Sequence, residues 1–131
     1  MKNILKVSSV LFLALFILAG CRTAAVYNVN NDPIEVNASM EKVYKAIKIA
    51  GASKGWIITQ VKPGLAMGKI MLRQHQAVVE IPYNEKSFSI KYKSSLNLKY
   101  NSQTNQIHQN YNGWVQNLEN AINLQLSMYA K

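Results

Sequence analysis

Cysteine is almost absent from this sequence. Cys21 is the only cysteine among 131 residues, so the chain cannot close a disulfide within itself. A folded domain built from this chain must therefore be held together by its hydrophobic core alone. The position of the single cysteine needs an explanation other than cross-linking.

Motifs of several enzyme classes are missing as well. The sequence has no H-E-x-x-H motif and no glycine-rich phosphate loop. Asp32 is the single aspartate, so a catalytic triad would have to be completed by a glutamate. The two histidines, His75 and His108, lie in different segments without the spacing of metal ligands. We therefore predict a non-catalytic protein with no cofactor and no metal ion.

No apolar run is long enough for a conventional membrane span. The run Val10–Ala19 has ten residues, whereas a helix needs about 20 to cross a bilayer. Lys2 and Lys6 make the start of the chain basic, and small residues follow the apolar run. This order of segments is typical of a secretory signal peptide, which we predict over residues 1–20.

The residues Leu18-Ala19-Gly20-Cys21 resemble the lipobox of bacterial lipoproteins. In that family the cysteine thiol receives a diacylglycerol, a dedicated peptidase cuts before the cysteine, and the new amino terminus is often acylated, with chains such as palmitate. The attacking group is a thiolate, which is why the position must be a cysteine. The resemblance implies cleavage between Gly20 and Cys21 and lipidation of Cys21.

A lipidated Cys21 would place the protein in the cell envelope. Two or three acyl chains anchor a protein stably, whereas one chain binds only marginally. The lipoprotein resemblance also bears on which membrane is used, because an aspartate after the cysteine tends to retain such proteins in the inner membrane. Arg22 stands there instead, so we expect the outer membrane, with the domain facing the periplasm.

The charge of the chain is strongly unbalanced. Once Lys2 and Lys6 leave with the signal peptide, thirteen basic residues face six acidic ones, a net charge of +7. A basic protein often binds nucleic acid, but an exported lipoprotein rarely meets it. The expected partners are anionic lipid, lipopolysaccharide, a cell-wall polymer or an envelope protein. A merely soluble basic surface explains the charge equally well.

The remaining sequence predicts a tether and one domain. Residues 21–33 lack clear periodicity and are predicted to form the lipidated terminus and a tether that reaches at most about 40 Å. Residues 34–131 then form a single domain. Helical spacing of apolar residues predicts helices over about 40–54 and 110–129. Strand-like segments lie between them, at residues 56–61, 65–73, 76–83 and 87–93, the last of which continues its alternation to Tyr100.

This order of helix, strands and helix predicts an α+β fold. We expect an antiparallel sheet of about four strands with both helices packed on one face. If Phe88, Ile90 and Tyr92 face the helices, the alternating cations face away. A candidate anion-binding face follows, made of Lys69, Arg73, Lys91, Lys93 and Lys99. The alternative is a solvated face whose lysines discourage pairing with other strands.

A second candidate site lies in the segment Ile107–Trp114, which is rich in side chains that form hydrogen bonds. A small pocket for a sugar or another small ligand is predicted there, lined by His108, Asn110, Tyr111, Asn112 and Trp114. The alternative is that these side chains only fix the loop before the last helix. Binding of a small ligand is thus the second functional hypothesis, after binding of an anionic surface or a partner protein.

The sequence carries two further resemblances. Trp56, the SFSIKY segment and the motif Tyr111-Asn112-Gly113-Trp114 resemble features of small uncharacterised bacterial envelope lipoproteins, and this likeness implies no activity. The segment Glu35–Ser39 resembles the acidic N-glycosylation sequon used by some bacteria, with Asn37 as the acceptor. Ser39 or Asn37 also suits the cap of the first predicted helix.

Overall fold

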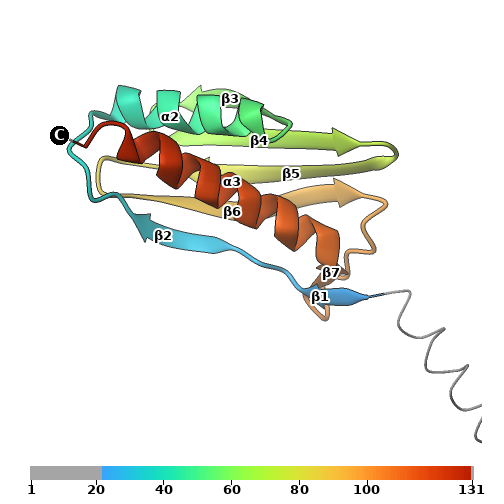
Figure 1. Ribbon diagram of the computed structural model, residues 1–131. Coiled ribbons are helices and arrows are strands. Elements are labelled where there is room, and N and C mark those ends of the chain that lie inside the picture. Colours follow the sequence, from blue (N-terminus) through green and yellow to red (C-terminus); the bar gives the residue numbers. More distant parts are fainter. Residues whose placement is uncertain (1–21, 131) are drawn as a thin grey trace, which may run out of the picture.

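The computed structural model describes residues 22–130, which form seven strands and two helices (Figure 1). In chain order these are β1 (Thr23–Ala25), β2 (Val29–Pro33), α2 (Met40–Ser53), β3 (Trp56–Lys62), β4 (Leu65–Leu72), β5 (His75–Pro82), β6 (Ser87–Leu96), β7 (Gln106–His108) and α3 (Gln109–Ser127). The predicted signal peptide, its cleavage site and Cys21 lie outside the described residues.

The main sheet has five antiparallel strands in the order β2-β6-β5-β4-β3, and β1 pairs with β7 in a separate two-stranded sheet. Helices α2 and α3 pack against each other and lie on one face of the main sheet (Figure 1). The α+β class, the antiparallel sheet and the two helices are thereby confirmed. The expected number of strands is too low, because hydrophobic patterning does not reveal β1, β2 or β7.

The predicted tether is part of the fold. Strand β2 pairs with β6 at the edge of the main sheet, and β1 pairs with β7 in a register that sets Thr23 opposite His108. β1 has the sequence Thr-Ala-Ala and β2 is polar apart from Pro33 and the buried Val29, so both strands are short of the alternating apolar side chains that mark the other strands. The predicted tether over residues 21–33 is therefore wrong within the described part, where structure begins at Thr23.

The core lies between the sheet and the two helices. Alternate residues of the strands point toward the helices and are buried, among them Trp56, Ile70, Val79 and Ile90. The helices bury the apolar stripes that their spacing predicts, including Ile47 of α2 and Ile122 of α3. Ser39 caps α2 by accepting a hydrogen bond from the Lys42 N–H at 3.3 Å.

Strand β6 ends earlier than its alternation suggests. The strand stops at Leu96, and Asn97 and Lys99 take positive φ angles of 60° and 54°. This left-handed backbone interrupts the extended conformation and lets Leu98 turn into the core. Tyr100 then stacks on Tyr92, with ring centroids 4.2 Å apart. The alternation beyond Ser95 thus reflects packing of a loop, not a longer strand.

Replacing Gly51 by alanine is expected to lower the free energy of unfolding by about 1–3 kcal/mol, as overpacking a core usually does. A Cβ atom at Gly51 would collide with the Ile58 side chain, where α2 crosses β3. The matched control is Gly113→Ala in α3, where a Cβ atom meets nothing within 4 Å. That variant is expected to gain up to about 1 kcal/mol from helix propensity. Urea unfolding of both variants checks the difference, and equal stabilities would contradict the packing described here.

Candidate functional site

One face of the main sheet is left uncovered by the elements of residues 22–130, because both helices lie on the opposite face (Figure 1). We call it the outer face. Its side chains come from β3, β4, β5 and β6: Ile57, Thr59, Met67, Lys69, Val78, Glu80, Lys91 and Lys93, and the same register continues it through Met71, Gln76 and Leu96 at one end of the strands. Ile57 is 67% exposed, although both of its neighbours in β3 are buried. The outer face therefore offers apolar and cationic side chains to the surroundings.

The strand register sets these side chains in rows. Lys69 lies opposite Ile57 on one side and opposite Val78 on the other. In the next row Met67 lies opposite Glu80, which lies opposite Lys91. Directly opposite residues in a sheet have Cβ atoms about 5 Å apart. Cations and apolar groups are thus adjacent on one surface.

Only part of the predicted cationic cluster remains free to bind an anion. Lys93 Nζ lies 3.1 Å from Glu80 Oε1, and both side chains are close to half exposed. An exposed pair of this kind contributes about 0–1 kcal/mol to stability. Lys69 and Lys91 form no ion pair with any residue of 22–130. These two lysines carry most of the unpaired positive charge of the outer face.

The structure does not bring the five predicted cations onto one face. Arg73 lies in the turn between β4 and β5, and Lys99 lies in the loop that follows β6. Both have positive φ angles, 56° and 54°, so strand alternation does not apply to them. The predicted face of five cations is therefore reduced to Lys69, Lys91 and Lys93. Arg73 and Lys99 belong to one end of the molecule.

The residues predicted to line a pocket near α3 are used in holding the fold. His108 Nδ1 accepts a hydrogen bond from the Asn110 N–H at 3.1 Å, which caps α3. Asn112 Oδ1 accepts from the Tyr27 N–H, and Asn112 Nδ2 donates to the Ala25 carbonyl, both at 2.9 Å. This amide therefore fixes the connection between β1 and β2. These contacts favour the structural interpretation of the segment.

The aromatic residues of the same segment pack inward. Tyr111 is fully buried, and its ring meets Tyr92 edge to face with centroids 5.6 Å apart. Trp114 is half-buried against the core. Among the described side chains with buried polar atoms, the Tyr111 hydroxyl is one that has no hydrogen-bond partner. An aromatic ring enclosed in this way is not available for stacking on a sugar.

Replacing Tyr111 by phenylalanine is expected to raise the free energy of unfolding by about 1 kcal/mol, because a buried hydroxyl without a partner is costly. Burial raises the pKa of Tyr111 far above its usual value near 10. The folded chain then keeps the hydroxyl neutral while the unfolded chain ionises it, so stability falls as the pH rises above about 10. Urea unfolding at about pH 8 and about pH 11 should show a smaller loss for the variant. An equal loss in both proteins would contradict this assignment.

The segment Gly51-Ala52-Ser53-Lys54-Gly55 matches the G-x-S-x-G form of hydrolase nucleophiles. That motif needs a strand, a sharp turn and a helix, with the serine at the turn. Here Ser53 is the last residue of α2, and its hydroxyl donates to the Ala50 carbonyl at 2.7 Å. The context is a helix end, so the match carries no catalytic assignment.

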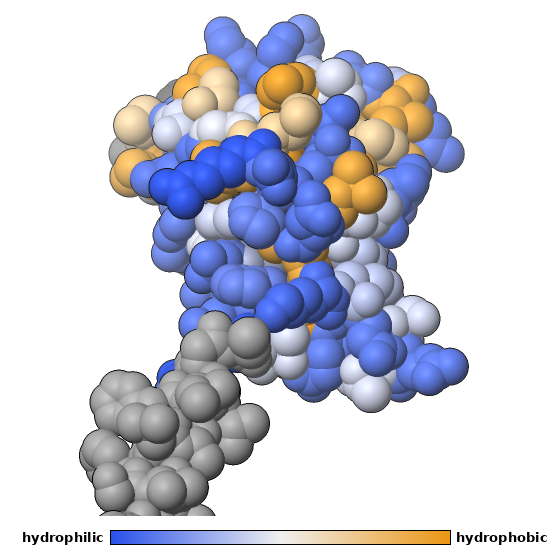
Figure 2. Space-filling view, turned by 90° about the vertical axis from the view of Figure 1, so that its right-hand side faces the viewer, coloured by the Kyte–Doolittle hydropathy of each residue, from blue (hydrophilic) through white to orange (hydrophobic). Residues whose placement is uncertain are grey.

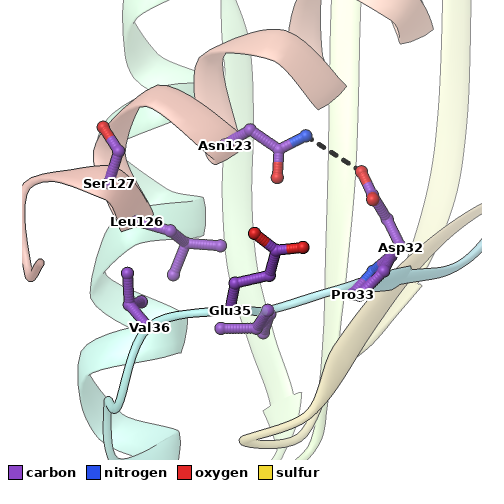
Figure 3. A pocket seen from close by; sticks show the side chains of 8 residues that line it. Asp32, Pro33, Glu35, Val36, Asn123, Leu126 and Ser127 are labelled. Atoms are coloured by element: carbon purple, nitrogen blue, oxygen red, sulfur yellow. Dashed lines mark hydrogen bonds between the residues drawn. The ribbon is translucent and has the colours of Figure 1, made fainter.

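The other end of the molecule contains a cavity of about 350 Å³ between the β2–α2 connection and the last turns of α3 (Figure 3). The carboxylates of Asp32 and Glu35 and the amide of Asn123 lie around it, and Leu126 forms part of its apolar wall. Asn123 Nδ2 donates to Asp32 Oδ2 at 2.9 Å. Glu35 also borders a second cavity, beside Tyr129. The wall is thus acidic and partly apolar.

Sequence reasoning missed this cavity because its walls come from distant segments. Asp32 falls in the predicted tether, Glu35 lies just after it, and Asn123 lies in the middle of a helical pattern. No short motif joins these residues, so only the docking of α3 beside β2 brings them together. Asn37 borders the second cavity and is exposed, and its glycosylation stays a prediction.

Comparisons with known proteins give this chain no relative. No protein-family model, curated protein or solved structure matches it. Within residues 22–130 no helix is both long and apolar enough to cross a bilayer. The same residues hold no group of three or more histidine, cysteine or acidic side chains placed to share a metal ion.

Proposed function

We propose that this protein is a non-catalytic lipoprotein of the cell envelope, anchored through Cys21, whose outer face binds an acidic partner protein. The anchor rests on the lipobox resemblance and on the short apolar segment before it. The outer membrane, facing the periplasm, is the location we propose, because Arg22 follows the cysteine.

The observation that carries the binding proposal is the uncovered outer face. Exposed apolar side chains lie there beside unpaired cations, and contiguous exposed apolar patches often mark protein interfaces. Ile57 and Met67 would supply the apolar contact, and Lys69 would meet a carboxylate of the partner. Opposite charges would also speed the encounter, with a rate that falls as salt rises.

Photo-crosslinking in the source cells tests this proposal. A benzophenone amino acid placed at Thr59 samples the outer face, and one at Asn117 samples the exposed side of α3. We expect the Thr59 position to capture one protein of defined mass, and the Asn117 position not to capture it. The adduct should be lost when Lys69→Glu and Lys91→Glu are combined, because both unpaired cations of the face are then reversed.

The charge control for this experiment is the pair Lys45→Glu with Lys48→Glu, which changes the net charge equally but on α2. The adduct from Thr59 should survive in that variant. An adduct from Thr59 that persists when Lys69→Glu and Lys91→Glu are combined would contradict the proposal. Adducts with lipid alone would mean that the outer face meets an anionic membrane surface instead of a protein.

A second candidate function is binding of a small cationic or hydroxyl-rich ligand in the cavity beside Asn123. The cavity of about 350 Å³ lies within the size range of small-molecule sites. With glucosamine as the probe, this alternative predicts amide shift changes near Asn123 and Ser127 in NMR spectra. Glu35→Gln should abolish them. An unchanged spectrum at millimolar glucosamine would remove this candidate.

A further inference from the structure

The described chain begins at one end of the molecule and is fixed there from its first residues. Thr23 pairs with His108 in the β1–β7 sheet, and the Gln109 N–H donates to the Arg22 carbonyl at 3.4 Å. One extended residue spans at most about 3.6 Å. An anchor at Cys21 would therefore hold this end of the domain at the membrane surface, because so few residues separate the anchor from β1.

The same end exposes a set of apolar and basic side chains (Figure 2), where hydrophobic and hydrophilic surface alternate. We call it the tip, made of Met71, Leu72, Arg73, Leu96 and Lys99. Met71 is 61% exposed, Leu72 45% and Leu96 59%. These residues lie at the end of β4, in the β4–β5 turn, at the end of β6 and in the loop after it.

Hydrogen bonds tie the tip to the start of the chain. Asn97 connects the end of β6 to the β4–β5 turn, since its Nδ2 donates to the Gln74 carbonyl at 2.7 Å and its own carbonyl lies 2.8 Å from His75 Nδ1. The His108 N–H donates to the Leu98 carbonyl at 2.8 Å. Because His108 also pairs with Thr23, the turn, the loop and β1 form one connected surface.

Acidic residues are absent from the tip and its supporting segments. Residues 22–28, 71–76 and 94–110 contain no aspartate or glutamate, whereas they contain Arg22, Arg73 and Lys99. Asp32, Glu35, Glu41 and Glu85 lie instead in β2, the β2–α2 connection, the first turn of α2 and the β5–β6 turn. In Figure 1 the β2–α2 connection, the start of α2 and the β5–β6 turn lie at the opposite end of the sheet from β1, and β2 ends there. The first turn of α2 and the β5–β6 turn also contain Lys42 and Lys86, so the tip differs from that end in having basic residues without acidic ones.

We propose that the tip docks on the anionic phospholipid surface of the membrane that carries the anchor. Met71, Leu72 and Leu96 enter the interfacial region, and Arg73 and Lys99 meet headgroup phosphates. The strands then stand upright on the membrane, and the outer face is presented sideways to a partner. This inference rests on the anchor in the proposed function, and it adds an orientation and a lipid contact that the anchor alone does not supply.

Labelling of the lipidated full-length protein tests the orientation. Cys21 is the only cysteine, so an acylated chain leaves a cysteine introduced elsewhere as the only reactive thiol. An environment-sensitive fluorophore is attached at Leu72→Cys or Leu96→Cys, and at Glu85→Cys as the control at the far end. The proteins are reconstituted in vesicles of phosphatidylcholine with phosphatidylglycerol, some of which carry a spin-labelled quenching lipid.

We expect the quenching lipid to quench the labels at positions 72 and 96 but not the label at position 85. Combining Arg73→Glu with Lys99→Glu should weaken tip contact with the anionic vesicles by roughly five-fold for each charge. Met71→Asp should weaken it by roughly ten-fold. Vesicles of phosphatidylcholine alone should quench the unmodified tip less.

The failures of the two proposals are distinguishable. A protein that floats with the vesicles, but whose labels at positions 72 and 96 behave like the one at 85, keeps its anchor and overturns the tip contact. A chain whose Cys21 still reacts with the fluorophore is not acylated, which overturns the anchor and the orientation derived from it.

Discussion

Replacing Ile47 by alanine is expected to lower the free energy of unfolding by about 2–5 kcal/mol, the usual cost of removing a large aliphatic side chain from a core. Ile47 is fully buried in α2, where this helix packs against α3. A domain of this size has about 5–15 kcal/mol of stability in total, and it has no disulfide to compensate for the loss. The expected loss is therefore a large fraction of the total stability.

The matched control lies two residues away in the same helix. Ile49 is 43% exposed, so Ile49→Ala removes the same atoms from the surface and should change stability by about 0.5 kcal/mol or less. Urea unfolding followed by circular dichroism measures both variants. Equal losses would mean that α2 does not present the face described here to the core.

Replacing Cys21 by serine is expected to release the protein from the membrane, because a hydroxyl does not take the place of the lipid-accepting thiol. Removal of the signal peptide also depends on this cysteine in a lipoprotein. The test therefore uses a variant in which residues 1–20 are exchanged for the signal peptide of a non-lipidated exported protein. Wild-type protein should sediment with membranes, and the variant should appear in the soluble fraction.

High salt provides the control for contacts other than the anchor. Any residual membrane binding of the variant through the tip is electrostatic in part and should be lost in a salt wash. The circular dichroism spectrum of the variant should match that of the wild-type domain, because residue 21 precedes the first strand. A variant that stays in the membrane pellet after the salt wash would contradict anchoring through Cys21.

Hydrophobic periodicity predicted the parts of the fold that bury apolar side chains. The stripe containing Ile47 placed α2 to within one residue of its end, and the alternation around Phe88 and Ile90 placed β6. These elements are visible in the sequence because burial selects one face of a helix or strand. The class of the fold follows from their order.

The edge strands could not be predicted in the same way. Residues Val29–Pro33 form a mostly polar segment in the sequence. They nevertheless form β2, because their backbone pairs with the edge of β6. Backbone pairing of this kind depends on the partner strand, not on side-chain type. The cavity near Asp32 was missed for the same reason, since β2 forms one of its walls.

The alternation of side chains along a strand predicts only part of the candidate cationic face. Lys69 and Lys91 lie inside strands, and their positions on the outer face agree with the pattern. Arg73 and Lys99 lie where the backbone has a positive φ angle. The two-residue periodicity of a strand therefore does not apply to their side chains. This break leaves Lys69 and Lys91 on the outer face and places Arg73 and Lys99 at one end of the molecule.

The measurement that tests the account most directly is metabolic labelling with an alkyne fatty acid, comparing the wild-type chain with Cys21→Ser and reading the mass of the mature protein. We expect label on the wild type alone and a mature chain that begins at Cys21. A wild-type chain that carries no label, or a label that persists in Cys21→Ser, would contradict the anchor and the orientation built on it.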